Sequence, residues 1–273
     1  MKTQEMLITP QIAERFLKEN KSNRPPTERL ISEYARQMKS GLWFEDTDES
    51  IKVDSSGLLV DGQHRLLALI RADVSLRFRV SIVPSEAYKY IDTGKKRTAR
   101  DAFAHDGISN YTNVAAGLRR YVALKKGLSI GYDSGGISMT DIRTSNAELL
   151  ALYSQSPNLY QGAYSNASSW YRKSGRLMRT TDIMAYYLCF SDLSADDAFA
   201  FMSFLFEGSA PDPRSPILLL RTRLLEDKTN TRYKISALIK NALIVKTWNL
   251  FRTKQTVLQL KFDVNRDKYP IAL

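Results

Sequence analysis

The chain has 273 residues, of which 43% are hydrophobic and 25% charged, a balance typical of a folded globular protein. Its 40 Lys and Arg against 29 Asp and Glu leave a net charge of +11, which favours polyanionic partners such as nucleic acid, nucleotides or anionic membrane. A single cysteine, Cys189, and two histidines exclude an internal disulfide and both cysteine-only and Cys2His2 zinc sites.

No apolar run approaches the ~20 residues that a transmembrane helix needs. The first residues, MKTQEMLITPQ, also lack the apolar core of a secretory signal. We therefore expect a cytoplasmic protein with no membrane partner.

The front third alternates between helical and strand patterns. NRPP at 23–26 interrupts the chain between two helices. Thr98, followed three residues on by Asp101, matches a capping box and predicts the start of a further helix. Hydrophobic periodicity predicts helices over 10–20, 27–39 and 63–72 and near 85–90, with strands over 51–53, 58–60 and 76–83.

From about residue 110 onward the pattern is helical, with its main breaks at 127–136, at 207–216 and in the final residues. His105 falls at a predicted helix end, where a positive group suits the helix dipole. The predicted fold class is α+β. We expect a mixed α/β domain over 1–105 and a mostly α-helical domain over 106–273 packed on it, although no change in composition marks the boundary.

Two stretches of the second half contain no acidic residue. The first runs from Leu149 to Thr181, and its loop-like RKSGR segment makes Arg172, Lys173 and Arg176 the candidate DNA-binding residues. These cations predict binding mainly to the DNA backbone.

The second acid-free stretch, from Lys228 to Phe262, interleaves basic and aromatic side chains, as phosphate contacts combined with base stacking would require. Its helical part, ISALIKNALIVKTWNLF, is apolar almost all round, so a core helix with basic ends is the alternative. The aromatic residues concerned are Tyr233, Trp248, Phe251 and Phe262.

Residues 57–67, GLLVDGQHRLL, place a predicted strand, a tight turn and a helix start in immediate succession. Backbone N–H groups at a helix N-terminus bind anions, and Gly62 has no side chain to block a phosphate. Arg65 can grip a phosphate with two hydrogen bonds, and His64 can donate a hydrogen bond or a proton to a phosphoryl oxygen. The alternative is a structural corner in which Arg65 pairs with Asp61.

The string LVDGQHRL, together with NRP, YARQMKSGLW and IKVDSSGLLV before it, resembles the ParB N-terminal/sulfiredoxin-like superfamily. Within it the chain is most similar to DGQHR-type proteins of phages and mobile elements, often described as ParB-like nuclease domains. YIDTGKKRTARDAF and ALIVKTWNLFR resemble the same proteins. The resemblance implies that residues 62–65, including Gln63, hold a nucleoside triphosphate, either ATP or CTP, with Mg²⁺ as a candidate companion. It also implies a bacterial or phage-infected cell.

The chain departs from the family at Gln63. Partition proteins carry Glu there, and a neutral amide can serve neither as a carboxylate base nor as an anionic metal ligand. Sulfiredoxins carry a reactive cysteine at this position, so we do not expect a sulfinic acid reductase.

Two further segments can contribute to the site. Arg24 precedes a proline that holds it in extended chain, from which it can reach a phosphate. The turn DTGKKR supplies Asp92, the candidate catalytic base or metal ligand, and a possible second anion site formed by Thr93, Lys95 and Arg97. Ordinary solvated loops are the alternative for both segments.

Three functional hypotheses follow. The first is a nucleotide-binding, ParB-like protein that acts on DNA, with NTPase or nuclease activity as the candidate enzymatic function. The second is an enzyme that transfers phosphoryl or nucleotidyl groups to a small molecule or a modified base. The third is a non-catalytic interaction protein that has kept the fold.

Overall fold

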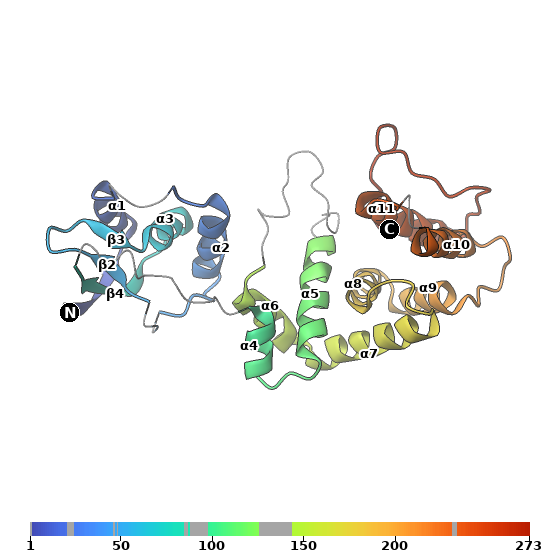
Figure 1. Ribbon diagram of the computed structural model, residues 1–273, viewed down its shortest axis with the longest axis horizontal. Helices are drawn as coiled ribbons and strands as arrows, with labels where there is room; N and C mark the ends of the chain where they lie inside the picture. The colour runs from blue at the N-terminus through green and yellow to red at the C-terminus, as the bar shows by residue number, and fades with distance from the viewer. Residues whose placement is uncertain are drawn as a thin grey trace. The chain divides into compact units, whose positions relative to one another are not determined.

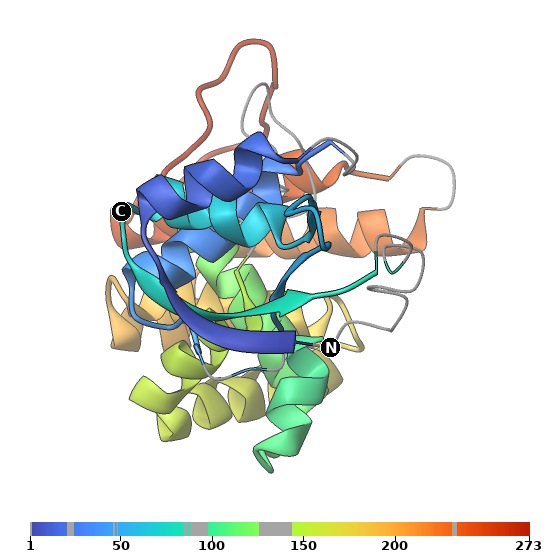
Figure 2. The same ribbon diagram turned by 90° about the vertical axis from the view of Figure 1, so that its left-hand side faces the viewer.

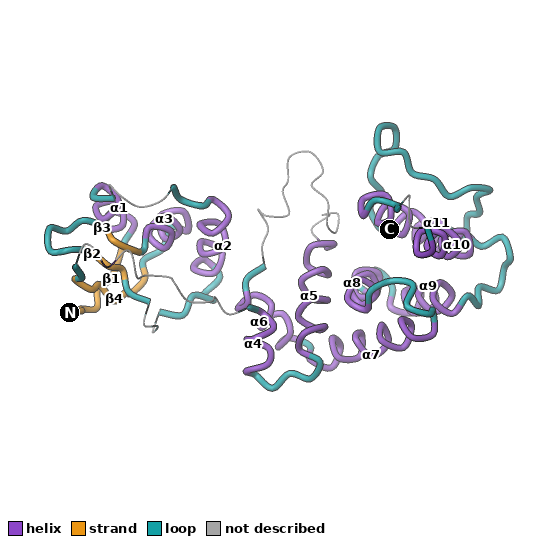
Figure 3. Tube along the Cα trace, viewed as in Figure 1, coloured by secondary structure: helices purple, strands orange, loops and turns teal. Residues whose placement is uncertain are grey.

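The structure is a computed structural model that describes residues 2–20, 25–45, 47, 49–84, 87, 98–125, 144–230 and 234–273. The fold is mixed α+β (Figures 1 and 3). The elements are β1 (Lys2–Ile8), α1 (Pro10–Lys18), α2 (Glu28–Lys39), β2 (Ile51–Val53), β3 (Leu59–Asp61), α3 (Gln63–Ala72), β4 (Leu76–Ile82), α4 (Ala99–His105), α5 (Tyr111–Lys125), α6 (Asn146–Gln155), α7 (Pro157–Lys173), α8 (Thr180–Ser191), α9 (Ala195–Glu207), α10 (Pro216–Thr229) and α11 (Ala237–Arg252).

The chain divides into two compact units. Unit 1 comprises Met1–Thr98 with Thr140–Glu148, and unit 2 comprises Ala99–Met139 with Leu149–Leu273. The strands belong to unit 1, whereas the described part of unit 2 is built from helices. Within the described ranges, no helix combines the length and the apolar character that crossing a bilayer requires.

The sheet of unit 1 has the strand order β1-β4-β2-β3. β1 is antiparallel to β4, β4 is parallel to β2, and β2 is antiparallel to β3. Helices α1 and α3 run side by side over the strands (Figure 2), and α2 packs against α3. Ile31, Ala35 and Met38 recur at helical spacing on α2 and are buried, which is why this face turns toward the core.

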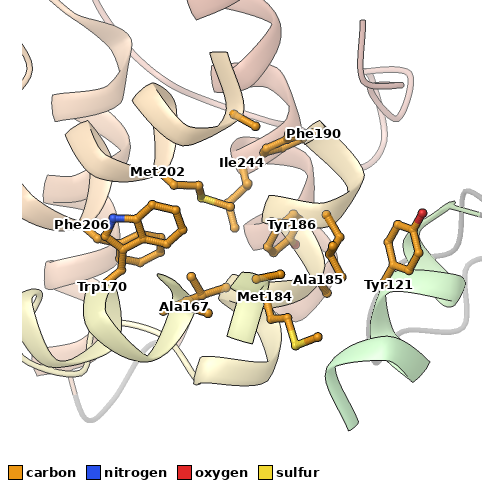
Figure 4. Close-up of a cluster of buried hydrophobic side chains, with 14 of the residues drawn as sticks. Tyr121, Ala167, Trp170, Met184, Ala185, Tyr186, Phe190, Met202, Phe206 and Ile244 are labelled. Atoms are coloured by element: carbon orange, nitrogen blue, oxygen red, sulfur yellow. The ribbon is translucent and has the colours of Figure 1, made fainter. Parts of the chain in front are cut away.

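The core of unit 2 is centred on Trp248 of α11, which is completely buried. Its ring stacks on Phe190 of α8 at a centroid distance of 4.3 Å and meets Phe201 of α9 edge-on at 5.5 Å. Figure 4 shows part of this cluster, including Phe190 and Ile244. The core-helix alternative is therefore confirmed for Trp248, whose ring is not available to stack on a nucleic-acid base.

Most elements of unit 1 were predictable, but β1 was not. Lys2–Ile8 is an edge strand whose residues 3–5 and 7 are exposed, so it lacks a clear alternation of buried and exposed positions. The predicted breaks at 23–26 and 127–136 and the predicted helix near 85–90 lie largely or wholly outside the described residues. The break at 207–216 is confirmed, because α9 ends at Glu207 and α10 begins at Pro216.

Helices α5 and α8 pack closely because α5 has a glycine at their contact. A Cβ built on Gly117 would overlap the sulfur atom of Met184, which is fully buried. Gly162 of α7 is also helical, but it is exposed and a Cβ there would meet no atom within 4 Å.

These two glycines predict opposite effects of the same substitution. Gly117→Ala should lower the free energy of unfolding by about 1–2 kcal/mol, because overpacking outweighs the gain in helix propensity. Gly162→Ala should raise the free energy of unfolding by about 0.5–1 kcal/mol, because only the propensity changes. Denaturant unfolding of both variants measures the difference, and equal shifts would contradict the assigned packing.

Candidate functional site

The corner between β3 and α3 depends on Gly62, whose φ of 110° lies in the region that favours glycine. A Cβ at this position would lie 2.5 Å from the terminal carbon of Ile51, a fully buried side chain of β2. Gly62 therefore allows both the turn and the close packing of the corner on the sheet. As the N-cap residue of α3 it also offers no side chain to the first N–H groups of the helix.

Gln63 and His64, in the first turn of α3, are buried, and each accepts a hydrogen bond from a residue of the segment between α1 and α2. Gln63 Oε1 accepts a hydrogen bond from Asn20 Nδ2 at 3.0 Å, and His64 Nε2 accepts one from the backbone N–H of Thr27 at 2.9 Å. Asn20 and Thr27 stand on either side of the NRP motif in the chain. The first turn of α3 therefore tethers the two ends of the segment that carries this motif.

The tether also defines the tautomer of His64. A neutral ring that accepts at Nε2 carries its proton on Nδ1, so Nδ1 is the ring's donor. An imidazolium has no acceptor and cannot keep the bond from Thr27. Acid catalysis by His64, as predicted from the sequence, would have to proceed from Nδ1 or break the tether.

Arg65 is buried and makes two strong contacts. It donates one hydrogen bond to Asp61 Oδ2 at 3.0 Å and another to the backbone carbonyl of Glu49 at 2.8 Å. The alternative in which Arg65 pairs with Asp61 is confirmed. Bidentate binding of a phosphate by Arg65 stays a prediction, because the guanidinium would have to exchange one of these partners for the phosphate.

Asp61 serves two cations at once. Lys52 Nζ lies 3.0 Å from the same Oδ2 atom that accepts from Arg65. Glu49 Oε2 also lies 3.7 Å from Arg65, so the carboxylates of Asp61 and Glu49 balance the two cations next to the N-terminus of α3. The ion pairs of Asp61 are largely shielded from water, since only 9% of the Arg65 side chain and 22% of the Lys52 side chain are exposed.

Several predicted site residues lie outside the described part of the chain. They are Arg24, Asp92, Thr93, Lys95 and Arg97. Among the described residues, no three His, Cys, Asp or Glu side chains gather in a way that would hold a metal ion. Burial raises the pKa of Cys189 to about 12, so this thiol is protonated and weakly nucleophilic at neutral pH.

The predicted DNA-binding residues lie at the C-terminal end of α7. Arg172 and Lys173 close the helix, and Gly175 follows with a φ of 64°. The N–H of Arg176 donates to the carbonyl of Tyr171 at 2.8 Å, and the N–H of Gly175 donates to that of Arg172 at 3.1 Å. This pair of bonds is a Schellman motif, which gives the RKSGR segment a fixed backbone.

The second acid-free stretch meets the first at this cap. Lys228, near the end of α10, donates a hydrogen bond to the carbonyl of Gly175, and Lys234 donates to the carbonyl of Lys228 at 3.2 Å. Segments more than fifty residues apart thus place their cations together. We call this group the basic cluster, and its exposed members are Arg172, Lys173, Arg176, Lys228 and Lys234.

Acidic residues neutralise little of the basic cluster. Lys173 forms an ion pair with Glu207 at 2.7 Å, whereas the other four cations have no ion pair within the described residues. Arg172 donates to the Ser168 hydroxyl at 3.0 Å instead. The basic cluster therefore keeps most of its positive charge. The ion pair of Lys173 with Glu207 shows that a cation of an acid-free stretch can pair with an acidic residue of another helix.

Asp227 holds the connection between α10 and α11, which bears Lys234 of the cluster. Its carboxylate accepts from Lys240 Nζ and from the N–H of Ile235, each at 2.6 Å. Burial by itself would raise the pKa of Asp227, but these hydrogen bonds hold the pKa below its usual value. Asp227 therefore stays ionised at neutral pH. It pairs with Lys240 and also attracts Lys234, a member of the basic cluster.

Comparison with known proteins assigns no function to the α3 corner or to the basic cluster. No protein-family model matches the chain, and neither a curated protein nor a solved structure does.

Replacement of His64 should release the Thr27 amide, whereas replacement of the exposed His105 should not. His64→Ala removes the acceptor of the Thr27 N–H, so hydrogen exchange at the Thr27 amide should accelerate and the free energy of unfolding should fall by about 1–2 kcal/mol. His105, whose side chain is 80% exposed at the end of α4, provides the control variant His105→Ala. Unchanged Thr27 exchange in His64→Ala would contradict the tether.

Proposed function

We propose that the protein binds DNA mainly through phosphate contacts, with the basic cluster of unit 2 as the binding surface. The observation that carries this proposal is the hydrogen bond from Lys228 to Gly175, which joins the two acid-free stretches into one exposed group of cations. Four of the five cations lack an ion pair among the described residues and are exposed. Such a group neutralises phosphates and releases counterions on binding.

Hydrogen bonds hold the backbone that carries the basic cluster in one conformation. The Schellman motif fixes the segment around Gly175, and Asp227 fixes the connection to α11. Cations at the C-terminal ends of α7 and α10 also interact favourably with the helix dipoles. A rigid backbone that presents flexible cations suits phosphates, which carry no sequence information, so we expect weak sequence preference.

Charge reversal at the basic cluster tests the proposal. In Arg172→Glu/Arg176→Glu the affinity for DNA should fall by about 10- to 100-fold for every DNA sequence, and the salt dependence should lose about two counterions. Fluorescence anisotropy with labelled DNA at several salt concentrations measures both. Lys173 is left unchanged because it already pairs with Glu207.

A control variant makes the same change in net charge elsewhere on unit 2. Arg214 and Arg266 have side chains that are 85% and 86% exposed, in segments that contribute nothing to the cluster. Arg214→Glu/Arg266→Glu should bind DNA nearly as the parent does. Equal weakening by both double variants would mean that only overall charge matters and would contradict a localised binding surface.

We also infer that the corner of unit 1 binds a nucleotide, ATP or CTP, as the resemblance of LVDGQHRL to the ParB/sulfiredoxin-like superfamily implies. The observation in favour is the position of two cations, Lys52 and Arg65, beside the N-terminus of α3. NTPase or nuclease activity on DNA is the enzymatic function that goes with this proposal, with Mg²⁺ as the candidate metal.

Thermal shift with ATP, ADP, CTP and GTP, with and without Mg²⁺, tests nucleotide binding. A nucleotide at 100 times its dissociation constant should add about 2.7 kcal/mol of stability. Lys52→Ala removes the more exposed of the two cations and should reduce that gain. Stabilisation without turnover would favour a non-catalytic protein, and turnover without DNA binding would favour the transferase. No shift with any nucleotide would contradict the proposed site.

A further inference from the structure

We propose that the DNA held by the basic cluster is single-stranded and that Phe199 provides a surface on which one of its bases stacks. This inference rests on the proposed function, because it concerns the DNA that the basic cluster binds. It starts from a large aromatic side chain that the fold leaves half exposed. Phe199 lies on α9 and is 49% exposed.

Phe199 is supported from beneath by Trp170. The two ring centroids are 5.5 Å apart, and Trp170 is itself buried and meets Tyr187 edge-on at 5.2 Å. Trp170 belongs to the core cluster drawn in Figure 4. An aromatic ring that rests on a packed core loses little conformational freedom when a ligand covers its open side, which favours stacking.

The position of Phe199 relates it to the basic cluster. Trp170 precedes Lys173 by three residues on α7, so their Cβ atoms are about 5–6 Å apart on the same side of the helix. Helices α7 and α9 are in contact, and the ion pair of Lys173 with Glu207 ties the end of α9 to the end of α7. The half-exposed ring therefore rests on Trp170, which lies one helical turn before Lys173 of the basic cluster.

An exposed aromatic ring near cations favours single-stranded DNA over duplex DNA. In duplex DNA each base is already stacked and paired, so a side chain outside the grooves meets only the backbone. In a single strand the bases are free to stack on protein aromatics, at about 1–3 kcal/mol per base, whatever their sequence. Cations beside one exposed, rigid aromatic ring thus suit a single strand better than a duplex.

The test compares variants of Phe199 with a labelled oligothymidylate, which forms no secondary structure, and with a duplex of the same length. The parent should bind the single strand more tightly. Phe199→Ala should weaken single-strand binding by about 5- to 100-fold and leave duplex binding unchanged, because a stacked base but no phosphate contact is lost. Its salt dependence should match that of the parent for the same reason.

Three controls isolate stacking from folding. Phe199→Trp keeps a flat ring and should retain single-strand binding. Phe199→Leu keeps most of the packing against Trp170 but should bind like Phe199→Ala. Phe44 of unit 1, which is 71% exposed, provides the matched variant Phe44→Ala, for which single-strand affinity should stay at the parent's value.

The outcomes separate this inference from the proposed function. If Phe199→Ala binds the single strand as the parent does, or if the parent prefers the duplex, the stacking surface is refuted while phosphate binding by the basic cluster stands. If Arg172→Glu/Arg176→Glu binds as the parent does, the proposed function itself fails. If an oligomer without bases binds the parent as tightly as oligothymidylate does, stacking is refuted again.

Discussion

Burial of Trp248 is the constraint on which the arrangement of unit 2 depends. Its ring lies flat on Phe190 of α8 and edge-on to Phe201 of α9, so α11 can occupy only one position against these helices. The end of α10 is then tied to α11 through Asp227 and Lys240 and to the end of α7 through Lys228 and Gly175. Packing of an aromatic core thereby brings distant cations together at the surface.

The sequence predicted the elements whose signals are local. The helix beginning at Gln63 follows from a strand, a glycine and a run of helical period, and the structure has α3 in that place. β1 was missed because only Met6 and Ile8 pack on the core, and the exposed residues Thr3, Gln4 and Glu5 before them follow one another without alternation. The strand order, with β1 beside β4, is a long-range property that no local pattern of residues contains.

The candidate sites show the same limit. Arg172, Lys173 and Arg176 stand together in the sequence and could be selected from it. Lys228 and Lys234 join them only through the hydrogen bond from Lys228 to the carbonyl of Gly175 and the one from Lys234 to the carbonyl of Lys228. An acid-free stretch of sequence does not ensure a positive surface, because an acidic residue of another helix can pair with its cations, as Glu207 does with Lys173. At the α3 corner, both interpretations of Arg65 fitted the sequence. The structure shows the pairing with Asp61, and phosphate binding stays a prediction.

Distant cations that form one phosphate-binding surface should release counterions together when DNA binds. The salt dependence of DNA binding measures this release. With four unpaired cations that each release about 0.7–0.9 counterions, the logarithm of the binding constant should fall against the logarithm of salt concentration with a slope of about −2.8 to −3.6. A measured slope in that range would support phosphate binding by the basic cluster. A slope near zero, or no binding at low salt, would contradict it.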